Sequence, residues 1–70
     1  MEQEEIEEIL ALVKSMTNPF ILDRLSDCIS VDVRCAVAMN VCTDESTILH
    51  LACDHDATVV QAVANGLARW

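Results

Sequence analysis

The stretch RCAVAMN, residues 34–40, is followed by the similar stretch VQAVANG, residues 60–66, which lies 26 positions further along the chain. The same register aligns identical residues outside these stretches as well. The identical pairs are Thr17 with Thr43, Leu25 with Leu51, Val33 with Val59, Ala36 with Ala62, Val37 with Val63 and Ala38 with Ala64. Asn40 falls on Gly66, and both residue types commonly end a helix in the left-handed conformation. A repeat of this length predicts a short solenoid of helical units.

The composition agrees with an all-α fold. The chain has 70 residues and is 53% hydrophobic, with one Gly and one Pro, which is too apolar for disorder and too poor in turn residues for an all-β fold. We expect a single domain over residues 1–70. It divides into an N-terminal amphipathic capping helix (1–16), a first helical-hairpin repeat (17–42) and a second one (43–70), with about five helices in all.

The apolar spacing places the helices. Residues 2–16 form the first, whose apolar stripe consists of Ile6, Ile9, Leu10, Val13 and Met16. In the first repeat Thr17 or Asn18 caps a short helix that begins at Pro19 and directs Phe20, Leu22 and Leu25 inward. In the second, Thr43 or Asp44 caps a helix whose apolar face is Ile48, Leu49 and Leu51. Ser30 and Asp56 are the expected caps of the second helix in each repeat.

The segment from Leu25 to Asn65 resembles the variant leucine-rich repeat. The resemblance is carried by VDVRCAVAMN in the first repeat and ATVVQAVAN in the second, where Val60 replaces the Arg of the pattern. It covers residues 17–66, and HEAT repeats have a similar helical design. Such repeats are mostly interaction scaffolds, so the resemblance implies a binding role and no catalytic residues.

The charge of the chain bears on its partners. Twelve acids against four bases give a net charge of −8. Phosphate backbones and anionic membranes are bound mainly through Lys and Arg, so direct binding to either is disfavoured. A basic protein surface is the natural counterpart. No stretch has the length of a signal peptide's or membrane span's apolar run, and we therefore expect a cytoplasmic protein, in the host cytoplasm if it is phage-encoded.

Few residues are candidates for catalysis or metal binding. Cys28, Cys35, Cys42 and Cys53 are expected to be thiols that act as small buried hydrophobes, because their spacing does not match structural zinc sites. Cys53 and His55 form a weak candidate pair, and His50 is expected to be an ordinary histidine beside core leucines. No Gly-rich loop or oxyanion-hole element accompanies them. We therefore predict no enzyme activity, no metal site and no cofactor.

The acids are the predicted partner-binding residues. They crowd the first turns of the N-terminal helix and recur at helix starts and turns, where a stacked repeat would align them along an edge. The set is Glu2, Glu4, Glu5, Glu7, Glu8, Asp23, Asp27, Asp32, Asp44, Asp54 and Asp56, with Leu67 and Trp70 as a further apolar contact. Aligned carboxylates imitate nucleic-acid phosphates. In size and charge the chain is analogous to the small acidic anti-CRISPR and DNA-mimic inhibitors of phages.

Two other functions stay open. In the first, the chain is a structural or assembly protein that forms homo-oligomers, a homodimer included, through the open ends of its repeat. In the second, it is a small metal- or redox-responsive protein that uses its four thiols. The leading prediction is a non-catalytic protein-binding module.

Overall fold

The computed structural model describes residues 3–67, and within this range it contains five α-helices and no strand. The helices are α1 (Gln3–Ser15), α2 (Pro19–Leu25), α3 (Val31–Met39), α4 (Glu45–Ala52) and α5 (Ala57–Leu67). The predicted all-α class is confirmed. No helix in the described part of the chain is long and apolar enough to cross a membrane.

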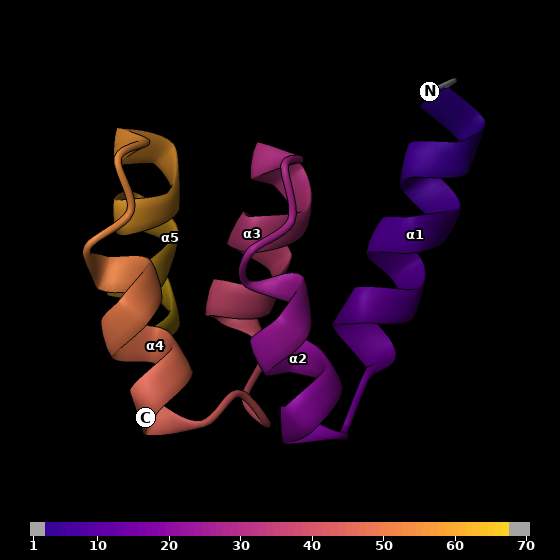
Figure 1. The fold of residues 1–70 in the computed structure, drawn as a ribbon. Coiled ribbons are helices and arrows are strands. Elements are labelled where there is room, and N and C mark those ends of the chain that lie inside the picture. The colour runs from indigo at the N-terminus through magenta and orange to yellow at the C-terminus, as the bar shows by residue number, and fades with distance from the viewer. Residues whose placement is uncertain (1–2, 68–70) are drawn as a thin grey trace.

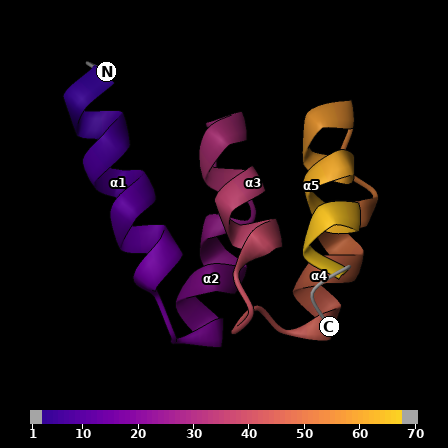
Figure 2. The same ribbon diagram turned by 180° about the vertical axis from the view of Figure 1, so that it is seen from behind.

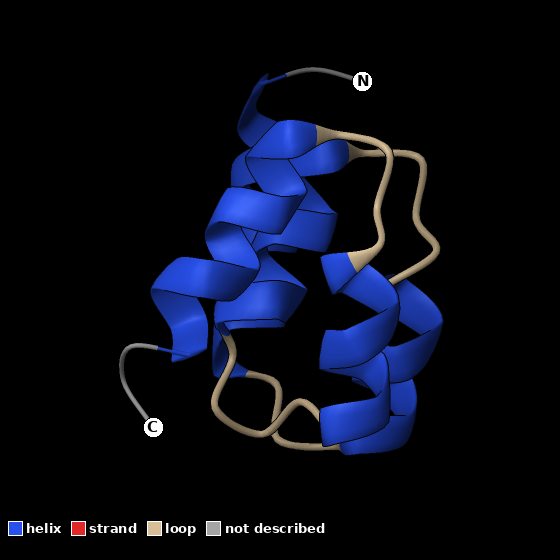
Figure 3. Ribbon diagram, turned by 90° about the vertical axis from the view of Figure 1, so that its left-hand side faces the viewer, coloured by secondary structure: helices blue, strands red, loops and turns tan. Residues whose placement is uncertain are grey.

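The helices form two layers. Helices α1, α3 and α5 lie in one layer, and the short helices α2 and α4 lie in the other (Figure 3). Helix α3 is central: it lies between α1 and α5 in its own layer and also contacts α2 and α4 (Figure 1). The hairpins α2–α3 and α4–α5 lie side by side (Figure 1).

Helices α1, α3 and α5 run in the same direction, so that their first turns lie at one edge of the molecule (Figures 1 and 2). We call this the N-terminal edge; it also carries the turns at 26–30 and 53–56. The connections at 16–18 and 40–44 lie at the opposite edge. Helices α1, α3 and α5 thus present the unpaired N–H groups of their first turns to one side, where acidic side chains are favoured by the helix dipole.

The core repeats with the 26-residue register. Positions that the register aligns are buried in both hairpins, and their exposed fractions are at most 9%. These pairs are Leu22 with Ile48, Val33 with Val59, Ala36 with Ala62 and Val37 with Val63. Burying a Val or Leu side chain stabilises a fold by roughly 1.5–3 kcal/mol, so these positions supply much of the driving force. The equivalence of the two hairpins as copies of one unit remains our interpretation of this pattern.

Two apolar residues expected inside are on the surface. Phe20 is 79% exposed and Leu49 is 62% exposed, which corrects the prediction for both. The reason is the same in each helix, because Phe20 lies two positions before buried Leu22 and Leu49 lies two positions before buried Leu51. Two positions correspond to about 200° around a helix, which directs the side chain away from the core.

The helix starts confirm the predicted cap positions, whereas the helix ends correct the sequence analysis. Asn18 caps α2, since its Oδ1 accepts from the N–H of Phe20 at 2.9 Å. Ser30 and Asp44 occupy the N-cap positions of α3 and α4 without a side-chain capping bond. No described residue has a positive φ, so the expected left-handed ends at Asn40 and Gly66 are wrong. Asn40 is extended.

Gly66 has a packing role within α5. A Cβ added at this position would lie 2.6 Å from the Ala38 carbonyl oxygen and 3.4 Å from the Met39 Cα. A side chain here therefore meets the backbone of α3, which has little freedom to move. Gly66 is required for the close approach of α5 to α3 rather than for a helix stop.

The replacement Gly66→Ala is expected to destabilise the protein by about 1–3 kcal/mol through this clash. The direction of the change in unfolding free energy tests for the clash, because Ala at an unobstructed helical position is more stable than Gly by roughly 0.5–1 kcal/mol. Chemical denaturation of the two proteins measures the difference. The exposed neighbour provides the control, since Asn65→Ala should change the unfolding free energy by less than about 0.5 kcal/mol. A more stable Gly66→Ala protein would contradict the close approach.

Candidate functional site

An ion pair between Arg34 and Asp54 joins the two hairpins. The Arg34 Nε donates to Asp54 Oδ2 at 2.9 Å, and the exposed fractions of the two side chains are 8% and 10%. The Arg34 guanidinium also donates through Nη1 to the carbonyl oxygens of Cys28 at 2.7 Å and Ile29 at 2.9 Å. One cation in α3 therefore fixes the turn that precedes its own helix to the turn that precedes α5.

Two further acids of the predicted site bond across the same seam. Asp23 Oδ1 accepts from the hydroxyl of the buried Thr47 at 2.8 Å. Asp27 Oδ1 lies 2.8 Å from Nε2 of His50, and both of these side chains are exposed. Asp23, Asp27 and Asp54 thus contribute to the contact between the hairpins, a role that the sequence analysis missed. The signal was present in the sequence, because the partners Thr47 and His50 lie 24 and 23 positions further on, close to the repeat length.

Asp54 and Asp56 also organise the turn before α5. Asp54 Oδ1 accepts from the N–H of Asp56 at 2.9 Å, and Asp56 Oδ1 accepts from the N–H of Thr58 at 2.8 Å. Asp56 therefore caps α5, as the sequence predicted. The pKa of the Asp54 carboxyl is lowered, first by the Asp56 hydrogen bond and further by the Arg34 charge, while partial burial opposes the shift.

The remaining acids face solvent at two separate places. Glu5, Glu8 and Asp32 are exposed in α1 and α3 at or near the N-terminal edge, and Glu7 is exposed among them. Asp44 precedes α4 at the opposite edge, so the predicted acids do not form a single column. Glu2 and Trp70 lie outside the described residues, as do the side chains of Glu4 and Leu67.

The turns at the N-terminal edge enclose a shallow groove of about 580 Å³. Its lining includes Cys28 from the first turn, His50 from α4, and Cys53 and His55 from the second turn. His55 is 91% exposed and lies 3.8 Å from Asp54 through its Nδ1. Within the described residues no three His, Cys, Asp or Glu side chains converge as metal ligands. The groove is therefore a seam between the hairpins that is lined in part by thiol and imidazole side chains.

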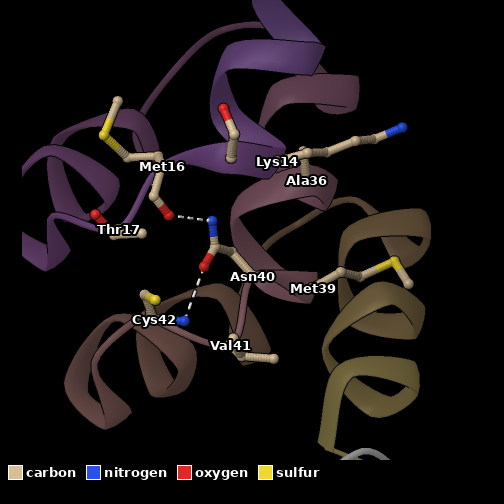
Figure 4. Close-up of a pocket in the computed structure, with 9 residues that line it drawn as sticks. Lys14, Met16, Thr17, Ala36, Met39, Asn40, Val41 and Cys42 are labelled. Carbon is tan, nitrogen blue, oxygen red and sulfur yellow. Dashed lines mark hydrogen bonds between the residues drawn. The ribbon is translucent and has the colours of Figure 1, made fainter.

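A second groove, of about 520 Å³, lies between the ends of α1 and α3 (Figure 4). Its lining is mainly apolar and includes Met16, Met39 and Val41, with Lys14 at its border. The buried amide of Asn40 holds this seam together. Its Nδ2 donates to the carbonyl oxygens of Val13 and Met16, each at 2.8 Å, and its Oδ1 accepts from the N–H of Cys42 at 2.8 Å.

The four thiols differ in their surroundings. All are free; Cys28, Cys35 and Cys42 are half-buried, whereas Cys53 is exposed, which corrects the prediction that all four are buried. The pKa of Cys35 is raised by burial and by the nearby negative charges of Asp32 and Asp56. A thiol with a raised pKa forms little thiolate at neutral pH.

No protein-family model, curated protein or solved structure matches this chain. The resemblance to variant leucine-rich repeats and the analogy to phage inhibitors stay predictions.

The acid stability of the protein should depend on Asp54. The Asp54 carboxyl has a lower pKa in the folded state than its ordinary value of 3.8. The stability that the ionised carboxylate contributes is therefore fully present above pH 3.8 and is lost as the pH falls through the lowered pKa. In Asp54→Asn this contribution is absent, so the variant should melt at a lower temperature near neutral pH and lose less stability between about pH 5 and pH 2. Thermal melts across the pH range measure both effects. Parallel acid profiles for the two proteins would contradict the role of the Asp54 charge.

The thiols should react in a fixed order with a maleimide under native conditions. The thiolate is the reactive species, so exposed Cys53 is expected to be modified first and Cys35 last. Peptide mapping by mass spectrometry after timed quenching gives the order, and Cys53→Ser, which should lose the fast phase, is the control. Early labelling of Cys35 would show that its surroundings are more open than described.

Proposed function

We propose that this chain is a non-catalytic protein-binding module that binds a basic partner through the N-terminal edge. The observation that carries the proposal is the placement of exposed Glu5, Glu8 and Asp32 on parallel helices that begin at the same edge. With a net charge of −8 the whole molecule attracts a basic surface and repels nucleic acid.

The geometry reduces the set of acids available to a partner. Asp54 is ion-paired and nearly buried, and Asp23 accepts a hydrogen bond from Thr47, so these two carboxylates are already used within the fold. Glu5, Glu8 and Asp32 are the described acids on which the proposal rests. The helices place these acids near one edge, since α1 and α3 both begin there (Figure 1).

The sharper form of the proposal is an inhibitor that occupies a nucleic-acid-binding surface, as anti-CRISPR and DNA-mimic proteins do, in the cytoplasm of the host. Its support is the analogy in size and charge together with the carboxylates at one edge. Affinity capture from the cells that make the protein, followed by mass spectrometry, tests it. Recovery of a nucleoprotein complex supports inhibition, whereas recovery of basic proteins without a nucleic-acid-handling role supports the broader binding module alone.

The captured partner should associate more slowly with Glu5→Lys/Glu8→Lys, by about tenfold or more, because charge complementarity acts mainly on the association rate. Association with the unmodified protein should also weaken as salt rises, since exposed charges are screened over about 10 Å at 0.1 M ionic strength. Surface plasmon resonance at several salt concentrations measures both.

A matched control reverses two acids at the opposite edge, in Asp44→Lys/Glu45→Lys, which changes the net charge equally. Circular dichroism checks that each variant is folded. If the two double variants slow association to the same extent, net charge alone explains the binding and the N-terminal edge is not the site. A rate that is independent of salt would favour an apolar interface instead.

A further inference from the structure

The face of α5 that packs on α3 follows a helical spacing. Its buried residues recur at intervals of three and four positions: Val59, Ala62, Val63 and Gly66. At Gly66 the two helices approach closely, since a Cβ added there would lie 3.4 Å from the Met39 Cα. Because α3 and α5 run in the same direction, this contact joins their last turns (Figures 1 and 2).

The same spacing continues in the sequence beyond the described residues. Trp70 is four positions after Gly66, and residues four apart in a helix share a face. The polar face of α5 keeps its register as well. Gln61 and Asn65 are exposed and hydrogen-bond to each other at 3.2 Å, and Arg69 is the next position in this series. The helical register thus assigns Trp70 to the face that contacts α3 and Arg69 to the polar face.

The groove between the ends of α1 and α3 adjoins the end of this α5 face. Met39 belongs to both surfaces, because its Cα is the atom that Gly66 approaches and its side chain, 38% exposed, lines the groove. Figure 4 shows the Met39 side chain extending toward α5. Val41, which follows α3 and is 64% exposed, continues the apolar lining, and Met16 completes it on the α1 side.

We propose that the indole of Trp70 occupies this groove and covers the end of the core. A helix rises about 1.5 Å per residue, so position 70 comes about 6 Å beyond Gly66, level with the residues that follow Met39. The groove volume of about 520 Å³ lies in the range of pockets that hold whole small molecules, roughly 300–1,000 Å³, so there is room for an indole. Thioethers such as those of Met16 and Met39 contact aromatic rings favourably.

Two features favour this occupant over a separate molecule. The indole belongs to the same chain and follows directly on a helix beside the groove, so its binding avoids the loss of translational freedom that a second molecule would suffer. Helices α1 and α3 both end at this edge, where the helix dipole disfavours anions, and a second copy carries a net charge of −8. The inference is independent of the proposed partner, because the N-terminal edge is the opposite edge of the molecule.

Fluorescence of the full chain tests the proposal directly, because Trp70 is the only tryptophan and the chain has no tyrosine. In the folded protein we expect emission at shorter wavelength than in the denatured chain, and protection of the indole from quenching by acrylamide. Val41→Asp should shift the emission to longer wavelength and remove this protection, because it places a charge in the apolar lining. The matched control is Ile29→Asp, the same charge on a 94% exposed residue at the opposite edge, which should leave both properties unchanged. Circular dichroism checks that both variants are folded.

A second measurement needs no change in the groove. The methyl resonances of Met16 and Met39 should shift in Trp70→Leu, because the ring current of the indole is lost, whereas Met1 serves as the reference that does not shift. Emission of the folded protein at the wavelength of the denatured chain would overturn the proposal, as would protection that Val41→Asp leaves intact. Protection that increases with protein concentration would show that the indole binds a second copy and would also overturn it.

Discussion

The buried guanidinium of Arg34 is the interaction on which the arrangement of the hairpins depends. A cation removed from water must be paired and hydrogen-bonded, and here two carbonyl oxygens and one carboxylate surround it. The carbonyls come from the turn before α3 and the carboxylate comes from the turn before α5. The ion pair consequently specifies how far apart the two hairpins stand. Apolar packing alone would fix that spacing less strictly, because it has little directional preference.

The other side of α3 is held by an uncharged group. Asn40 donates to the carbonyls of Val13 and Met16, which belong to the last turn of α1 and the connection after it. The final carbonyls of a helix lack partners within it, so this amide both satisfies them and fixes one end of α1. Toward its N-terminal end α1 diverges from α3 (Figures 1 and 2). The glutamates therefore project from the less enclosed end of the helix.

Much of the fold follows from the sequence, and the failures have definite physical causes. The 26-residue register, the single Pro and the apolar spacing were sufficient for the helices and most of the core. Phe20 and Leu49 were misplaced because apolar character was counted without the angle between neighbours on a short helix. Asn40 and Gly66 were interpreted as local stop signals, whereas their roles lie in contacts with α1 and α3. Such contacts join distant parts of the chain, and a local pattern does not contain them.

The candidate site was predicted less well than the fold for a related reason. Composition identifies acids but not their partners, and only the structure shows that Asp23 and Asp54 are engaged across the hairpin seam. The burial of Arg34 was likewise not predicted, although its place in the repeat pattern was noted. Val60 stands at the aligned position of the second hairpin, and the described residues contain no following hairpin that an Arg there could contact.

The central position of α3 has a consequence for unfolding. Long helical arrays lose their terminal units separately, because each unit contacts only its neighbours. In this molecule the same helix contacts α1, α2, α4 and α5, so no described helix is packed independently of it. Detaching any unit would uncover the surface on which the others rest. We therefore expect the described helices to unfold as a single cooperative unit, in which fraying at one end is transmitted directly to the centre.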